Sequence, residues 1–297
     1  MNSAYLVLEN GKVFKGRSFG ATGEVLSEIV FSTGMVGYLE TLTDKSFYGQ
    51  TVVHTFPSIG NYGVIPSDFE GDIIGPAAYI VKEWCQEPSN FRCEGNLDAF
   101  LKEKGIIGIC GIDTRALTRN HREEGTMNGF ITTDPEKADN DAIKNYRIKD
   151  AVKNVSSKDT KVFECENREF TVAVIDCGAK MSTVKQLNRY ACEVHLMPCT
   201  ATLSDIKAIG ADGVVISDGP GDPSGNTDII NNIKAIFESG IPLFGIGLGH
   251  QMIALANGFR TEKALLFLYS RPSHEPSLAF VKVVNALFSS MESLHTL

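Results

Sequence analysis

The stretch Ile241-Pro-Leu-Phe-Gly-Ile-Gly-Leu-Gly-His-Gln-Met-Ile-Ala-Leu-Ala-Asn-Gly258 decides how the second half of the chain folds. Its short apolar opening, bounded by Pro242 and Gly245, predicts a buried parallel strand. Its end, Gln251 to Asn257, is made of helix formers and is followed by Gly258, which is typical of a helix C-terminus. The stretch therefore predicts a strand, a tight turn and a helix.

The turn in this stretch, Gly245-Ile-Gly-Leu-Gly249, has the G-x-nucleophile-x-G spacing of a nucleophile elbow. Such a turn holds its middle residue in a strained conformation, with the side chain projecting over the end of the sheet. The flanking glycines are expected because no side chain fits against the neighbouring strands. Backbone N–H groups at the start of the helix favour negative charge at the same point. The middle residue here is Gly247, so the sequence predicts an elbow without a nucleophile.

The composition indicates a globular protein with two domains and an acidic surface. A chain of 297 residues with 43% hydrophobic and 22% charged residues is long enough for two cores. Its net charge of −8 argues against nucleic acid or an anionic membrane as a partner. No apolar run approaches the roughly 20 residues of a membrane span. The N-terminus does not have the pattern of a signal peptide.

The cysteines indicate a reduced, cytoplasmic protein. They show neither C-x-x-C nor zinc spacing, and they are scattered through apolar segments, so we expect free core thiols and no metal or cofactor. These residues are Cys85, Cys93, Cys110, Cys165, Cys177, Cys192 and Cys199.

Residues 1–133 predict a β-rich α+β domain. Asn10-Gly11 between two apolar runs predicts a hairpin, and Asp113 is expected to cap a helix that runs through Arg122. Further strands are expected at 25–31, 51–56, 73–81 and 106–110, with a helix at 97–104. Residues 134–168 are polar and show no clear period apart from a helix near 138–149, so we expect them to connect two domains.

Residues 169–263 predict an α/β domain with a parallel sheet. Strands alternate with helices of about ten residues, which indicates βαβ units and a sheet covered on both faces. Ligands bind such sheets at the carboxyl ends of the strands. Both the elbow and the loop Asp218-Gly-Pro-Gly-Asp222 fall at that end.

The loop after Asp218 has a predicted role in binding. Gly219 and Gly221 let the backbone approach a ligand closely, and Pro220 fixes the turn. A free N–H of the loop and that of Leu248 would form a two-donor oxyanion hole. The alternative interpretation is a tight loop that merely follows a buried strand.

Three stretches carry a family resemblance: Gly245-Ile-Gly-Leu-Gly-His-Gln251, Ser32-Thr-Gly-Met-Val-Gly-Tyr-Leu-Glu-Thr-Leu-Thr-Asp44 and Gly111-Ile-Asp-Thr-Arg-Ala-Leu-Thr-Arg119. The first resembles the Gly-Ile-Cys-Leu-Gly-His-Gln motif of class I glutamine amidotransferases. The other two resemble the N-terminal domain of the small, glutamine-hydrolysing subunit of carbamoyl-phosphate synthase. This resemblance covers roughly residues 4–263.

The resemblance implies a reaction and a set of binding residues. In this family a cysteine attacks the glutamine amide, and the released ammonia passes to a large ATP-dependent subunit that makes carbamoyl phosphate for arginine and pyrimidine biosynthesis. The expected partners are therefore L-glutamine and that large subunit. Gly247 stands at the nucleophile position. The implied glutamine-binding residues are Ser46, Gly219, Gly221, Leu248 and Gln251.

Some of these residues also have a purely structural interpretation. Ser46 fits a turn after Asp44, and Gln251 fits a polar residue at a helix N-terminus. His250 is expected to be a packed histidine, because the family's catalytic base comes from a later segment.

The resemblance is expected to end after about Lys263. The family continues there with a His-Pro-Glu motif that supplies the base and its orienting carboxylate, whereas this chain has His274-Glu275-Pro276. Adjacent residues on an extended segment point to opposite faces, so His274 and Glu275 are not expected to act as that pair. Residues 264–297 are accordingly expected to be a tail that results from truncation or divergence and leaves the second domain incomplete.

Three functional hypotheses remain at this point. The first is a small subunit that has lost glutaminase activity. The second is a non-catalytic glutamine-binding or regulatory module that docks on the large subunit. The third takes Gly245-x-Gly-x-Gly249 as a dinucleotide loop with Arg271 on a 2′-phosphate, but that fingerprint requires glycine where His250 stands.

Overall fold

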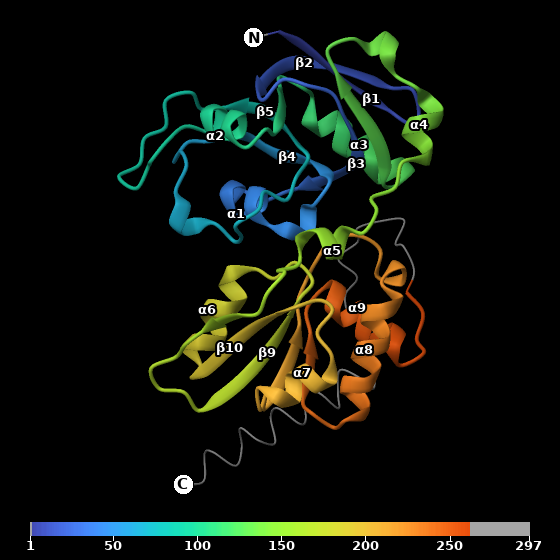
Figure 1. Cartoon of the computed structure of the whole chain (residues 1–297). Helices are drawn as coiled ribbons and strands as arrows, with labels where there is room; N and C mark the ends of the chain where they lie inside the picture. Colours follow the sequence, from blue (N-terminus) through green and yellow to red (C-terminus); the bar gives the residue numbers. More distant parts are fainter. Residues whose placement is uncertain (1, 262–297) are drawn as a thin grey trace. The chain divides into compact units, whose positions relative to one another are not determined.

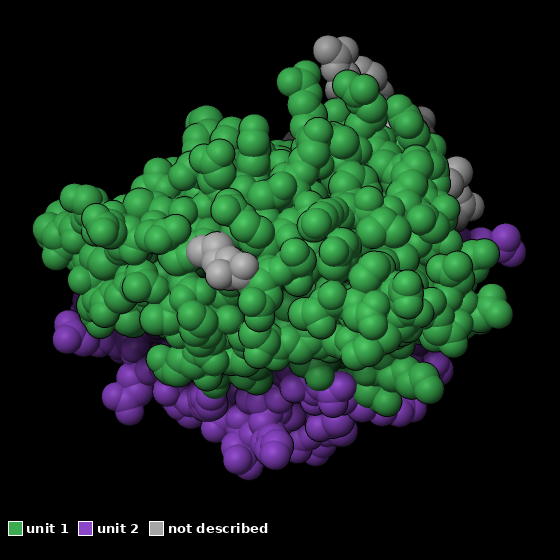
Figure 2. Space-filling view, turned by 90° about the horizontal axis from the view of Figure 1, so that it is seen from above, with its two compact units in different colours: residues 1–151 green, residues 152–297 purple. Residues whose placement is uncertain are grey.

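The chain divides into two compact units, Met1–Ala151 and Val152–Leu297 (Figures 1 and 2). The computed structural model describes residues 2–261. Both units mix helices and strands, as expected from the sequence. Within the described residues, no helix combines the length and apolar character needed to cross a bilayer.

The first unit contains a closed barrel in the strand order β1-β2-β6-β5-β4-β3-β7. The hairpin predicted at Asn10-Gly11 joins the first two strands, with Val7 opposite Val13. The strands are β1 (Ser3–Leu8), β2 (Val13–Gly20), β3 (Val25–Ser32), β4 (Gln50–Ile59), β5 (Ala78–Trp84), β6 (Ile107–Cys110) and β7 (Met127–Thr132).

Short helices accompany the barrel (Figure 1). They are α1 (Tyr38–Thr43), η1 (Lys45–Phe47), η2 (Pro66–Asp68), α2 (Leu97–Glu103), α3 (Thr114–Glu124), η3 (Pro135–Lys137) and α4 (Asn140–Asn145). The predicted cap of α3 is confirmed, because the Asp113 carboxylate accepts the N–H of Ala116 at 2.9 Å. The strand expected at 73–81 begins only at Ala78, since Gly75-Pro76 interrupts it and Pro76 has no N–H for a ladder.

Alternation along the barrel strands produces two cores. Val52 and Tyr79 belong to a cluster that packs α1 and α2, whereas Val53 and Ile80 belong to a cluster with Leu117 of α3. Successive side chains of a strand point to opposite faces, so neighbouring residues of β4 and β5 serve different clusters.

The second unit is a five-stranded sheet in the order β12-β11-β9-β10-β8. The strands are β8 (Lys161–Phe163), β9 (Phe170–Asp176), β10 (Cys192–Pro198), β11 (Gly213–Ile216) and β12 (Leu243–Gly245). The last four are parallel, as predicted, and β8 is an antiparallel edge strand.

Helices cover both faces of this sheet (Figure 1). They are α6 (Met181–Arg189), α7 (Leu203–Ala208), η4 (Pro223–Gly225), α8 (Thr227–Glu238) and α9 (Leu248–Ala256), preceded by α5 (Ala151–Val155). Val174 of β9 packs in one cluster with Val184 of α6, whereas Ile175 packs in the other with Ile233 of α8 and Met252 of α9.

The stretch 134–168, expected as a connection, holds ordered elements of both units. It contains η3 and α4 of the first unit and β8 of the second, and the division between the units falls inside it. The seven cysteines all lie in the described part of the chain and are free, as expected; Cys110, Cys177, Cys192 and Cys199 are buried, whereas Cys85, Cys93 and Cys165 are only half-buried.

Candidate functional site

The turn between β12 and α9 has the backbone of a nucleophile elbow. Gly247 has φ 50° and ψ −111°, a conformation in which a residue with a side chain is strained. Helix α9 begins at Leu248, so it starts earlier than the expected Gln251, and Gly247 is its N-cap. The middle residue of the turn therefore has the backbone conformation predicted from the glycine spacing, and glycine adopts it without strain.

The glycines that flank the elbow leave no room for a side chain. A Cβ atom on Gly249 would lie 2.3 Å from the carbonyl oxygen of Ile216 on β11. A Cβ on Gly245 would lie 2.6 Å from the backbone nitrogen of His250. Close contact with the neighbouring strand thus excludes a side chain at position 249, as expected. At position 245 it is the backbone of α9 that excludes one.

The N–H of Leu248, expected in an oxyanion hole, and one N–H of the loop, that of Gly219, converge on one atom, Oδ1 of Asp218. The N–H of Leu248 donates to this oxygen at 3.1 Å, and that of Gly219 donates to it at 2.8 Å. Two backbone donors aimed at one oxygen are the arrangement that stabilises an oxyanion in acyl transfer. In this chain that position is taken by the protein's own carboxylate.

Asp218 also fills the space above Gly247. A Cβ on Gly247 would lie 2.2 Å from Oδ1 of Asp218 and 2.6 Å from its Cγ. The carboxylate therefore stands where the side chain of a nucleophile would begin, and the missing side chain makes room for it.

The loop that carries Asp218 is held at the end of the sheet. The buried Ser217 hydroxyl donates to the carbonyl of Asp218 at 2.8 Å and accepts the N–H of Cys177 at 2.9 Å. Gly219 packs so closely on this segment that a Cβ there would lie 2.0 Å from the carbonyl oxygen of Cys177. These contacts fix the position from which the Asp218 side chain reaches the elbow.

The thiol of Cys177 does not replace the missing nucleophile. Its side chain is fully buried, and burial raises the pKa of the Cys177 thiol well above its usual range. A neutral, inaccessible thiol is a poor nucleophile.

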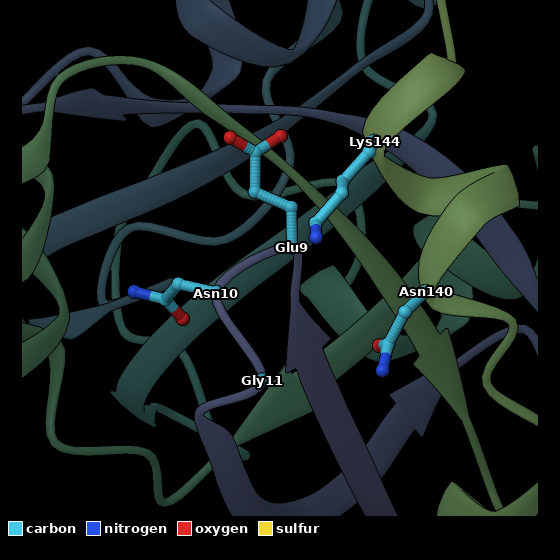
Figure 3. Close-up of a pocket in the computed structure, with 5 residues that line it drawn as sticks. All are labelled: Glu9, Asn10, Gly11, Asn140 and Lys144. Carbon is cyan, nitrogen blue, oxygen red and sulfur yellow. The ribbon is translucent and has the colours of Figure 1, made fainter.

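A separate pocket of about 440 Å³ lies in the first unit (Figure 3). Its lining consists of Glu9, Asn10 and Gly11 from the β1–β2 turn and Asn140 and Lys144 from α4. The Glu9 carboxylate already accepts the N–H of Asn128 at 2.9 Å. Nothing in this lining resembles the donor arrangement of the elbow.

Comparisons with known proteins agree over both units. Residues 6–131 match the family model described as carbamoyl-phosphate synthase small chain, CPSase domain, and residues 173–285 match that of class-I glutamine amidotransferase. A carbamoyl phosphate synthase small chain from Listeria monocytogenes is 43% identical over 268 residues, which are 89% of this chain and 72% of the relative. Relatives of the same name from Bacillus caldolyticus (44%; 87% of this chain, 71% of the relative) and Clostridium perfringens (41%; 88% and 74%) are similar.

The chain belongs to the family of carbamoyl phosphate synthase small chains.

Among solved structures, an aminopeptidase from Aneurinibacillus sp. strain AM-1 aligns over 86% of this chain and 69% of its own length, with a TM-score of 0.25 and 11% identity.

The structure brings together three of the predicted site residues of this small chain. Gly219, Gly247 and Leu248 surround the Asp218 carboxylate, and Gly221 forms the next turn of the same loop with φ 85°. Gln251 lies on the first turn of α9 with an exposed side chain.

Ser46 lies in the first unit, in the short helix η1. Its N–H donates to Asp44 at 2.9 Å, which agrees with a turn residue. Its hydroxyl oxygen, however, is buried and has no hydrogen-bond partner among the described residues. The binding role of Ser46 stays a prediction.

The expectation for His250 is wrong, and one residue of the site was missed. His250 is exposed rather than packed, because the buried face of α9 consists of Leu248, Gly249, Met252, Ile253 and Ala256. The sequence analysis did not assign a role to Asp218. Its acidic side chain at the start of the predicted oxyanion loop could have indicated one. Arg271, His274 and Glu275 lie outside the described residues.

Proposed function

We propose that this chain is a carbamoyl phosphate synthase small chain that docks on the large synthetase subunit without hydrolysing glutamine. The observation that carries the proposal is Gly247 at the tip of the elbow. The family reaction needs a covalent bond between a nucleophile and the glutamine carbonyl carbon. Glycine has no side chain with which to form it.

The occupied oxyanion hole supports the same conclusion. Hydrolysis passes through a tetrahedral intermediate whose oxygen needs the N–H groups of Gly219 and Leu248, and both already donate to Asp218. Both features therefore oppose the same step, because the tetrahedral intermediate needs a nucleophile to form it and free N–H donors to stabilise it.

Docking is supported by family membership. The first unit matches the small-chain domain over residues 6–131, and relatives named as small chains align with almost nine-tenths of the sequence. In such a complex the large subunit would use free ammonia to make carbamoyl phosphate, the precursor of arginine and pyrimidines.

The test is to mix the purified chain with a cognate large subunit. We expect a complex in sedimentation velocity, carbamoyl phosphate synthesis with ammonium chloride, and none with glutamine as nitrogen source. The large subunit alone is the control. Synthesis from glutamine would overturn the loss of glutaminase activity, and failure to form a complex would overturn docking.

A second candidate is a regulatory module that binds glutamine without reaction. It is favoured by the Ser46 hydroxyl, a buried polar atom without a hydrogen-bond partner among the described residues, and by the exposed side chain of Gln251. Calorimetric titration with glutamine tests it: Ser46→Ala should weaken binding, whereas Ser204→Ala, an exposed serine on α7, should not. Absence of measurable binding to the unsubstituted chain would exclude this candidate.

A further inference from the structure

Both backbone N–H donors of the proposed oxyanion hole are present, and both donate to a side chain of the same protein. The donors from Gly219 and Leu248 belong to different loops, yet both reach Oδ1 of Asp218, at 2.8 and 3.1 Å. A carboxylate that accepts two N–H groups makes charge-assisted hydrogen bonds, which are stronger than neutral ones. Its position at the start of α9 adds a favourable interaction with the helix dipole.

We propose that Asp218 is an internal occupant of the oxyanion hole, which holds the place of a ligand oxygen and keeps carboxylate and amide ligands out of the elbow. This role of Asp218 is separate from the absence of a nucleophile, because it affects binding and not only reaction. Even a ligand that needs no covalent chemistry must first displace the Asp218 carboxylate from both donors.

A simple turn role does not account for these contacts. The hydrogen bond to the N–H of Gly219 joins neighbouring residues and would be satisfied in an ordinary turn. The hydrogen bond to Leu248 spans 30 residues and reaches the N-terminus of another element. It also depends on Gly247, because a Cβ there would lie 2.2 Å from the same oxygen.

Position 247 and position 218 are therefore coupled. A side chain at 247 and a carboxylate in the hole exclude one another in the observed geometry, so glycine at the elbow tip is the condition under which Asp218 can act. Removal of the carboxylate should leave two unsatisfied N–H donors. A small external carboxylate such as acetate has the charge and size to satisfy them.

The sequence permits direct observation of one of these donors. Gly247-Leu248 is the one Gly-Leu pair among the 297 residues, so a chain labelled with ¹³C-carbonyl glycine and ¹⁵N-leucine gives a single carbonyl-selected amide resonance, that of Leu248. In Asp218→Ala this resonance should move upfield, because the amide proton loses a carboxylate acceptor. Acetate should then return it downfield in a saturable manner.

The unsubstituted chain should respond to acetate only at concentrations higher by a factor on the order of ten or more, since the internal carboxylate competes at a millimolar or greater effective concentration. Asp222→Ala is the matched control. Asp222 lies in the same loop but accepts the N–H of Ser224, so this substitution should leave the Leu248 resonance in place. A merely structural role of Asp218 would give no recovery with acetate.

If Asp218→Ala does not fold, Asp218→Asn can be measured in its place. The amide oxygen of asparagine can accept the same two N–H groups but carries no charge, so the Leu248 resonance should move part of the way upfield. The proposal is overturned if the resonance stays within the change caused by Asp222→Ala, or if acetate acts equally on the unsubstituted and alanine-substituted chains. The measurement needs no large subunit, so its outcome is independent of docking.

Discussion

The Oδ1 atom of Asp218 accepts a 3.1 Å hydrogen bond from the backbone N–H of Leu248, 30 residues further along the chain. This contact joins the loop after β11 to the first residue of α9 at the carboxyl edge of the sheet. It places a carboxylate oxygen at the proposed oxyanion hole, where two backbone N–H donors meet. The elbow thus has glycine at its tip and a carboxylate on the two N–H donors beside it.

Gly247→Cys alone should give an unreactive thiol. A cysteine at this position would meet the Asp218 carboxylate, because the distance from its Cβ to Oδ1 would be 2.2 Å, and a nearby like charge disfavours the thiolate. In Gly247→Cys/Asp218→Ala the N–H donors and the helix N-terminus should instead lower the thiol pKa. While the pKa of the thiol lies above neutral pH, lowering it by one unit increases the thiolate fraction about tenfold.

The measurement is the rate of alkylation by iodoacetamide at residue 247, read by peptide mass spectrometry because the chain has seven other cysteines. Gly247→Cys/Asp222→Ala is the control and should react as slowly as the single substitution. Equal rates for the single and the Asp218→Ala double variant would show that the carboxylate does not restrain the elbow.

Gly249→Ala should destabilise the second unit. The added Cβ would lie 2.3 Å from the carbonyl oxygen of Ile216, a backbone atom that is held in the sheet. Overpacking of this kind lowers the free energy of unfolding by about 1–3 kcal/mol. Gly225→Ala is the matched control, because a Cβ there has no neighbour within 4 Å, and its effect should stay within about 0.5 kcal/mol. Urea unfolding of the two variants measures the difference, and equal stabilities would contradict the observed packing of the elbow.

Acid should destabilise the barrel through His54. This residue is fully buried on β4, and burial lowers the pKa of its imidazole from the ordinary value of 6.5. Below that value the unfolded chain binds a proton that the folded chain does not, so the free energy of unfolding should fall as the pH decreases below about 6.5. The full stability is present above the pKa of the unfolded state.

His54→Gln should flatten this pH dependence in urea titrations. Tyr79→Phe is the control, since it removes the 2.8 Å hydrogen bond between the tyrosine hydroxyl and Nδ1 of His54 but leaves the imidazole buried. It should lower stability at every pH and keep the slope. A slope that is unchanged in His54→Gln would assign the acid sensitivity to other groups.

Local patterns predicted much of the fold because their causes are local. The glycine spacing around Gly247 predicted the strained turn, and Asp113 predicted the start of α3, since capping involves residues only three positions apart. The βαβ alternation predicted the parallel sheet of the second unit. The error at residues 73–77 came from reading apolar residues as a strand across Gly75-Pro76.

The decisive feature of the site was not predictable in the same way. The contact between Asp218 and Leu248 depends on parallel pairing of β11 with β12, which brings Ile216 beside Gly245. Sequence spacing gives no distance between residues that are 30 positions apart. The exposure of His250 likewise followed from where α9 starts, because that start decides which face of the helix is buried.

The loss of glutaminase activity is tested by measuring the release of ammonia from glutamine by the purified chain in complex with the large subunit. We expect no release above that of the large subunit alone, because loss of a catalytic nucleophile costs about 10⁶-fold in turnover where it has been measured. Gly247→Ala in the same complex is the reference for an elbow without a nucleophile, and it should be indistinguishable from the unsubstituted chain. Steady multiple-turnover ammonia release by the unsubstituted chain would show that the elbow without a nucleophile still hydrolyses glutamine.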